Sequence, residues 1–111
     1  MTIISYEDFA NVEICSGTII KVEPFPRAQK PAYKVWADFG ERGVLQTSAQ
    51  VTVHYTPDSL VGRQVLGVVN LGAKNIAGFE SQFLMLGCSD PQGAVCLATL
   101  DPRVENGKKL F

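Results

Sequence analysis

The sequence has little of what metal sites require. It contains one histidine and three cysteines, and no two cysteines form a Cys-x-x-Cys pair. A structural zinc site needs about four cysteine or histidine ligands, so it would have to use all of these residues. We therefore expect Cys15, Cys88 and Cys96 to be reduced, buried and small side chains, with no metal bound.

The sequence also lacks the motifs of nucleophilic and phosphate chemistry. Nucleophilic catalysis needs a serine or cysteine beside a base, and His54 is the only histidine that could act as this base. No Gly-x-Ser-x-Gly elbow accompanies it, and no Gly-x-Gly-x-x-Gly loop is present. We expect a protein that is not an enzyme, with no catalytic residue and no cofactor, in which His54 is structural or lies at the surface.

Long apolar runs are missing too. The longest, Val65–Val69 and Phe83–Leu86, are far shorter than the roughly 20 residues that cross a bilayer as a helix. The N-terminus has no basic segment followed by an apolar stretch, so we expect no signal peptide and a cytoplasmic protein. The 111 residues, 46% of them hydrophobic and 19% charged, predict one globular domain over residues 1–111, with 1–10 and 100–111 as terminal extensions.

No strong excess of either charge is present. The formal net charge is −1, whereas a dedicated nucleic-acid-binding protein usually has a clear basic excess. The charges are unevenly distributed, however. Residues 24–37 hold Arg27, Lys30 and Lys34 and no acidic residue. The sequence therefore predicts a local basic patch on a nearly neutral protein.

Alternation of apolar and polar residues predicts five strands, at residues 12–22, 33–39, 44–50, 65–71 and 82–88, with residues 94–98 extending the last hairpin. In the first strand the even-numbered residues are expected to face the core. Gly17 in its middle predicts a bulge or sharp bend. Ser5 is a plausible helix N-cap, with Asp8 three residues on, and Thr56-Pro57 predicts one helical turn before Gly62. Five strands with a short helix between the third and fourth predict an all-β, five-stranded Greek-key barrel of the OB type.

Two features suggest a binding surface on this barrel. Alternation places Trp36 on the face away from the core, beside Lys34, where we expect it to pack under a loop or a subunit rather than to bind a ligand. Residues 70–81 are predicted to form a loop that carries Ile76 and Phe79. This loop either packs onto the barrel or binds a partner, and the residues alone leave both open.

Several short motifs resemble one known family. The opening strand around Val12–Glu23, then Phe25-Pro26-Arg27-Ala28, Ser48-Ala49-Gln50 and Ile76-Ala77-Gly78-Phe79, are similar to the tRNA-binding-domain family. That family includes free-standing dimeric tRNA-binding proteins and C-terminal domains of some aminoacyl-tRNA synthetases. Within it, the sequence is most similar to the CsaA subgroup of secretion chaperones, over residues 6–109.

The resemblance implies an OB barrel that forms a homodimer and has no membrane-inserted part. It also implies one of two ligands, unfolded precursor polypeptides destined for export or tRNA recognised by shape and backbone. The implied peptide- or tRNA-binding residues are Lys21, Lys34, Ser48, Gln50, Asn70, Lys74, Ile76, Phe79 and Ser81. The implied dimer contacts are Ile3, Ile4, Tyr6, Phe9, Leu110 and Phe111.

The sequence departs from the CsaA pattern at two places and from that of many tRNA-binding relatives at a third. Gly72-Ala73-Lys74-Asn75 stands where two prolines and two basic residues are usual, Glu80 replaces a basic residue, and Leu84 replaces the methionine of many relatives. Because tRNA binding depends on neutralising phosphates, the lost positive charge favours the chaperone hypothesis over tRNA binding. A structural adaptor for another protein is the third possibility.

Overall fold

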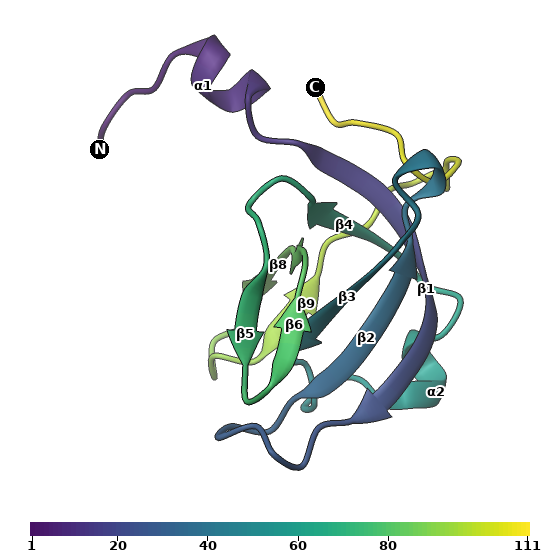
Figure 1. Ribbon diagram of the computed structural model, residues 1–111. Helices are drawn as coiled ribbons and strands as arrows, with labels where there is room; N and C mark the ends of the chain where they lie inside the picture. Colours follow the sequence, from purple (N-terminus) through teal and green to yellow (C-terminus); the bar gives the residue numbers. More distant parts are fainter.

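The computed structural model describes all 111 residues and shows a five-stranded antiparallel sheet that curls into a nearly closed barrel (Figure 1). The strands follow the order β3-β2-β1-β4-β7, and their bounds are β1 Ile14–Pro24, β2 Tyr33–Asp38, β3 Val44–Ala49, β4 Gln64–Val68 and β7 Leu84–Met85. The open side is narrowed where Gln82 N donates to Gln46 O of β3 at 2.7 Å. This architecture confirms the predicted all-β barrel of the OB type.

The C-terminal half differs from the prediction. Residues 70–81, predicted to be a loop, contain a hairpin of β5 (Lys74–Ile76) and β6 (Phe79–Ser81). The fifth strand, predicted at residues 82–88, is divided into two strands because the chain changes its pairing partner at Leu86. Leu86 N donates to Leu66 O of β4, whereas Leu86 O accepts from Ala98 N. From there β8 (Gly87–Ser89) pairs with β9 (Val95–Leu97) around a turn at Asp90–Gly93.

Both predicted helix starts are confirmed. In α1 (Tyr6–Ala10), Ser5 Oγ accepts from Asp8 N at 3.0 Å, and Asp8 Oδ2 accepts from Ser5 N at 3.3 Å. In α2 (Pro57–Leu60), Thr56 and Ser59 make the same reciprocal pair. Such capping boxes satisfy backbone N–H groups that a helix start leaves unpaired. A 3₁₀ turn, η1 (Gly40–Arg42), joins β2 to β3.

The phase predicted for the first strand is wrong. Up to residue 19 the odd-numbered side chains face the core, so that Ile19 is fully buried while Ile20 is 48% exposed. The bulge lies between Ile19 and Lys21 rather than at Gly17. Ser16 is buried as well, but its Oγ donates to the Glu105 carbonyl of the C-terminal segment. The alternation in the sequence was misleading because the C-terminal segment covers the second face of β1, so that side chains on both faces are buried.

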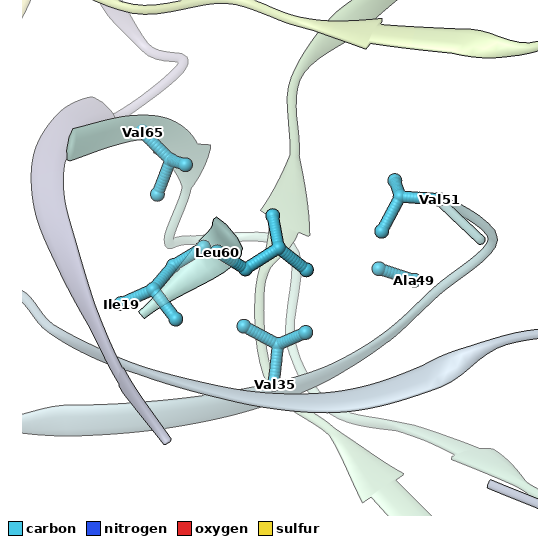
Figure 2. Packing of buried hydrophobic residues seen from close by; sticks show 6 residues of the cluster. All are labelled: Ile19, Val35, Ala49, Val51, Leu60 and Val65. Carbon is cyan, nitrogen blue, oxygen red and sulfur yellow. The ribbon is translucent and has the colours of Figure 1, made fainter. Parts of the chain in front are cut away.

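Two groups of buried side chains fill the barrel. The first surrounds Leu60 of α2, which closes one end of the barrel, and Figure 2 shows Leu60 at the middle of this group. Its members are Ile19, Val35, Ala49, Val51, Leu60 and Val65. In the second group, the rings of Phe39 and Phe83 meet edge to face with centroids 4.8 Å apart. Burying these side chains supplies most of the free energy of folding.

The C-terminal segment continues the sheet at the first half of β1. Ser16 N donates to Lys108 O, and Leu110 N donates to Ile14 O. Both termini lie at the same end of the molecule (Figure 1). The structure contains no helix that is long and apolar enough to cross a membrane.

Candidate ligand-binding face

The bulge in β1 positions the first residues of the candidate site. After the bulge, Lys21 pairs with Trp36 of β2, and directly opposed residues on antiparallel strands share one face. Lys21 Nζ lies 4.6 Å from the centroid of the Trp36 ring. The predicted outward face of β2 is thus confirmed, and it carries a cation stacked on an aromatic ring.

Phe79 of β6 lies at the centre of this face. Its ring centroid is 5.8 Å from that of Trp36 and 5.6 Å from that of Phe25, both edge to face. Lys34 Nζ lies 5.0 Å from the Phe25 ring and 5.1 Å from the Phe79 ring. We call Lys21, Phe25, Lys34, Trp36 and Phe79 the aromatic-basic face. The expectation that Trp36 packs under another segment is confirmed, because Phe79 belongs to the β5–β6 hairpin.

Hydrogen bonds fasten this hairpin to β3. Gln46 of β3 accepts from Trp36 Nε1 at 3.1 Å through Oε1, and its Nε2 donates to Glu80 O at 2.9 Å. Ser81 Oγ lies 2.9 Å from Thr47 Oγ1 and accepts from Ser48 N. These bonds use backbone and side-chain groups of both elements, so the hairpin is held at a defined place on the barrel.

The turn of the hairpin has an uncommon conformation. Ala77 has φ 49° and is the only non-glycine residue with positive φ, and Gly78 follows with φ 86°. Two successive left-handed residues are typical of the type I′ turn, which favours asparagine and glycine. The left-handed region costs a residue such as alanine roughly 1 kcal/mol. Asn75 Oδ1 accepts from Gly78 N at 2.9 Å and stabilises the turn.

A groove of about 400 Å³ lies between this turn, the end of β3 and the basic loop before β2. We call it the hairpin groove. Apolar side chains and polar groups that can donate or accept hydrogen bonds line it together. The apolar residues are Ala28, Ala32, Ile76 and Ala77, and the polar ones are Gln29, Lys30, Ser48, Gln50 and Asn75.

Positive charge gathers around the groove. Lys30 lines it, and the Arg27 guanidinium lies near the hairpin turn, since a Cβ on Gly78 would be 3.9 Å from Arg27 Nη1. Glu80 pairs with Asn75 across the hairpin, one residue from the Ile76–Phe79 pair. Because neighbouring residues of a strand point to opposite faces, Glu80 points away from the aromatic-basic face. Glu80, which stands where a basic residue is usual, therefore lowers the positive charge of this face less than the sequence suggested.

The structure brings together most of the predicted ligand residues. Lys21, Lys34 and Phe79 belong to the aromatic-basic face, and Ser48, Gln50 and Ile76 line the hairpin groove. Lys74 is exposed at the start of β5. Ser81 braces the hairpin against β3, as described above.

Asn70 is not brought to this face. Its Oδ1 accepts from Glu13 N at 2.9 Å and its Nδ2 donates to Asn11 O at 2.8 Å, so it holds the segment before β1. Sequence reasoning missed Phe25 as a site residue, although its ring is 4% exposed and lies under both Lys34 and Phe79. The signal was its position among prolines in the basic loop, where an aromatic residue has no strand to pack in.

The cysteines follow the expectation only in part. Cys15 is buried at 1% exposure, as predicted, but Cys88 and Cys96 are exposed on β8 and β9. The sequence placed all three in the core because cysteine is among the most buried residue types. The short hairpin that carries the two exposed cysteines was not predicted as a separate sheet.

Comparisons with known proteins agree with this geometry. Residues 14–109 match a family model described as a putative tRNA binding domain. The chaperone CsaA from Bacillus anthracis str. Ames is 38% identical, with a TM-score of 0.94 over 99% of this chain and 100% of that one. CsaA from Picrophilus torridus is 40% identical, with a TM-score of 0.92 over 98% and 100%. The methionine–tRNA ligase of Methanosarcina mazei is 32% identical over 99% of this chain, which spans only 15% of that enzyme.

Proposed function

Because the chain belongs to the tRNA-binding-domain family, we propose that it acts as a CsaA-like chaperone without enzymatic activity. In this proposal a homodimer in the cytoplasm binds extended segments of unfolded precursor proteins before export. The observation that carries the proposal is the hairpin groove, which combines apolar walls with amide and hydroxyl groups. Both solved CsaA structures named above match nearly the whole chain, which supports this function over that of a large enzyme.

The groove fits an extended polypeptide in its chemistry. Ile76 and the alanines offer apolar contacts to side chains of many kinds, while Gln50 and Asn75 offer hydrogen bonds to a backbone. Strand β5 pairs only with β6, so its other edge has free backbone groups (Figure 1). A peptide that adds to such an edge gains main-chain hydrogen bonds irrespective of its sequence. A chaperone needs this tolerance because its clients differ.

A specific observation supports tRNA binding as the second candidate. Basic side chains surround the same groove, and Glu80 points away from the neighbouring aromatic-basic face. A homodimer would double this patch, and such a surface can bind tRNA despite a formal net charge of −1. Aromatic rings near basic side chains are also typical of single-stranded nucleic-acid sites. The rings here are engaged with one another and with lysines, which leaves less free ring surface for stacking bases.

The proposed dimer contacts lie together at one end of the molecule. Ile3, Ile4 and Tyr6 are 93%, 60% and 72% exposed, and Phe111 is fully exposed. Phe9, Leu110 and Phe111 line a shallow apolar hollow with Tyr6 and Ala10. Apolar side chains that are exposed and contiguous are typical of protein interfaces. We therefore propose that a second copy of the chain covers this end.

The deciding experiment compares two labelled ligands on the same protein. Fluorescence anisotropy is measured with bulk tRNA and with a reduced, carboxymethylated protein as unfolded client, at low and at physiological salt. We expect client binding to persist at physiological salt and tRNA binding to be lost, because phosphate contacts weaken as salt rises. Tight tRNA binding at physiological salt, without client binding, would reverse the order of the two candidates.

Charge variants show whether both ligands use this face. Replacing Lys34 and Lys74 by glutamate should abolish tRNA binding and leave client binding partly intact. Replacing Lys108, an exposed lysine of the C-terminal segment, by glutamate is the matched control and should change neither strongly. Ile76→Ser should weaken client binding by about tenfold or more, since burying an isoleucine contributes roughly 1.5–3 kcal/mol. Equal loss of both ligands in the lysine variant would mean that one charge-dependent site serves both.

A further inference from the structure

Away from the hairpin groove, three side chains with metal-binding atoms meet at the β8–β9 hairpin. They are His54, Asp90 and Cys96, and their ligand atoms all lie within 4.8 Å of one another. His54 Nε2 lies 2.6 Å from Asp90 Oδ2. The aromatic-basic face and the proposed dimer contacts do not involve these residues, so the function proposed above gives them no role.

Cys88 is close to this cluster, although it is not one of the three residues whose ligand atoms lie within 4.8 Å of one another. It pairs directly with Cys96 across the hairpin, and opposed residues of antiparallel strands project to the same face with Cβ atoms about 4.5–5.5 Å apart. Asp90 comes two residues after Cys88, and residues two apart on extended chain also share a face. Two thiols, a carboxylate and an imidazole are thus on one side of the hairpin. Both thiols are exposed, so an ion can reach them.

The side chain of Asp90 is oriented by the backbone. Its Oδ1 accepts from Gln92 N and from Ala94 N, each at 2.9 Å, which leaves Oδ2 turned toward His54. A metal-binding carboxylate held by hydrogen bonds in this way is the usual arrangement around protein metal sites.

The loop that carries His54 is held against the hairpin by its neighbour. Tyr55 Oη accepts from Leu97 N of β9 at 2.8 Å, and Tyr55 O accepts from Tyr33 Oη at 2.9 Å. The side chain and the backbone of residue 55 are both fixed, which keeps the preceding residue beside Cys96. The site is thus assembled from two separate segments by bonds that do not involve its own ligand atoms.

We propose that His54, Cys88, Asp90 and Cys96 form a binding site for zinc or another thiophilic divalent cation. Zinc prefers a tetrahedral set of nitrogen, sulfur and oxygen ligands, with Zn–S about 2.3 Å and Zn–N about 2.0–2.1 Å. Ligand atoms around such an ion are about 3.3–3.8 Å apart, so His54 Nε2 and Asp90 Oδ2, which lie 2.6 Å apart, would separate when the ion binds. The ion would replace the hydrogen bond between His54 and Asp90 and would release the protons of the two thiols. The exposed cysteines, which sequence reasoning had set aside as core residues, thereby acquire a function.

The test titrates the reduced full-length protein with Co²⁺ and then with Zn²⁺. We expect one Co²⁺ per chain, with the near-ultraviolet absorption of thiolate–cobalt charge transfer, and displacement of Co²⁺ by Zn²⁺. Cys96→Ser and Cys88→Ser should each reduce this absorption to about half or less, because one of two thiolates remains, and the double variant should abolish it. His54→Ala should weaken Zn²⁺ binding. Asp58→Asn, at an exposed carboxylate of α2, is the control and should leave binding unchanged.

Three results would overturn the proposal. One is the absence of stoichiometric Co²⁺ binding by protein whose three thiols have been titrated as free. Another is charge-transfer absorption that survives in the Cys88→Ser/Cys96→Ser double variant, which would locate the metal elsewhere. The third is a Cys88–Cys96 disulfide that persists in reductant. Because Cys96 is exposed, circular dichroism should show that Cys96→Ser folds like the wild type, so loss of binding is not loss of structure.

Discussion

The ring of Phe39 lies directly against the backbone of Gly17, where a Cβ would be 2.6 Å from Phe39 Cε1. Gly17 is therefore a glycine because the core ring occupies the space of a side chain. We expect Gly17→Ala to lower the free energy of unfolding by about 1–3 kcal/mol, as overpacking of a well-filled core does. Urea denaturation measures the change.

A double-mutant cycle separates this contact from any effect on strand propensity. Phe39→Leu leaves room beside residue 17, at the cost of a cavity. In the Phe39→Leu background, Gly17→Ala should cost less than in the wild type, with a coupling of about 0.5–3 kcal/mol. Additive effects of the two substitutions would contradict the contact as the reason for the glycine.

Trp36 is the only tryptophan and belongs to the aromatic-basic face, so its emission reports on that face. We expect a bound client or tRNA to shift or quench the Trp36 fluorescence, since Lys21 and Phe79 contact the ring and would be displaced or shielded. Phe79→Leu should alter the emission of the free protein as well. Saturating ligand, verified by anisotropy, that leaves the emission unchanged would place the ligand on another surface.

Removal of residues 1–9 tests the proposed dimer. The deletion takes away Ile3, Ile4, Tyr6 and Phe9, whose apolar side chains have no burial site within one chain apart from the shallow hollow near Phe111. We expect a monomer or an insoluble barrel, as measured by light scattering coupled to size exclusion. A truncated protein that still elutes as a dimer would show that the interface lies elsewhere.

Glu13 makes stability depend on pH. It accepts from Lys109 Nζ at 2.6 Å and from Arg42 Nη2 at 2.7 Å, and the Lys109 hydrogen bond is the main cause that lowers the pKa of this carboxyl from its ordinary 4.5. A lowered pKa in the folded state stabilises the fold above the unfolded-state pKa. This contribution is lost as pH falls below about 4.5 through the folded-state pKa.

The melting temperature of Glu13→Gln should therefore fall less steeply with acid than that of the wild type. The difference between the two proteins should be largest near neutral pH and shrink below pH 4.5. Glu41→Gln, at an exposed carboxylate of η1, serves as the control and should follow the wild-type curve. If the melting temperatures of Glu13→Gln and the wild type fell in parallel from neutral to acid pH, this ion pair would be excluded as a cause of the pH dependence of stability.

Asn70 distinguishes a structural residue from a binding residue. We expect Asn70→Ala to destabilise the protein by roughly 1–2 kcal/mol, because two hydrogen bonds to the segment before β1 are lost. Binding of tRNA and of the client should be unchanged. Asn70→Asp keeps the acceptor for Glu13 N and should cost less. A selective loss of binding in a stable Asn70→Ala protein would return this residue to the ligand face.

How far the sequence predicts the fold depends on whether local signals decide each element. The helix caps at Ser5 and Thr56 and the alternation of β2 depend on residues close in sequence, and they were predicted correctly. The phase of β1 was wrong because Ser16 is buried by Glu105 and Lys108, about 90 residues away in the chain. No periodicity within the strand carries that information.

The candidate site was predictable to a similar extent. The family motif identified Ile76 and Phe79, and the basic patch of residues 24–37 included Lys34, yet Phe25 and the His54–Asp90–Cys96 cluster depend on tertiary contacts. The cluster combines residues from the loop after β3 and from both sides of the β8–β9 turn. Sequence reasoning counted only cysteine and histidine as ligands, so the aspartate was overlooked. The prediction that Cys88 and Cys96 are buried was wrong because the chain leaves the barrel at Leu86. Strand propensity does not encode this change of pairing partner.

The pairing of Ser16 with Lys108 also bears on how the protein is made. The backbone groups at the outer edge of β1 near residue 16 cannot form their hydrogen bonds until the segment around residue 108 has left the ribosome. The two segments are 92 residues apart in the chain. Until then the nascent chain exposes unpaired backbone groups next to an apolar core strand, a state prone to aggregation. Folding is therefore expected to complete only after nearly all of this sequence has been synthesised, and slowly for its length, since distant pairings must form last.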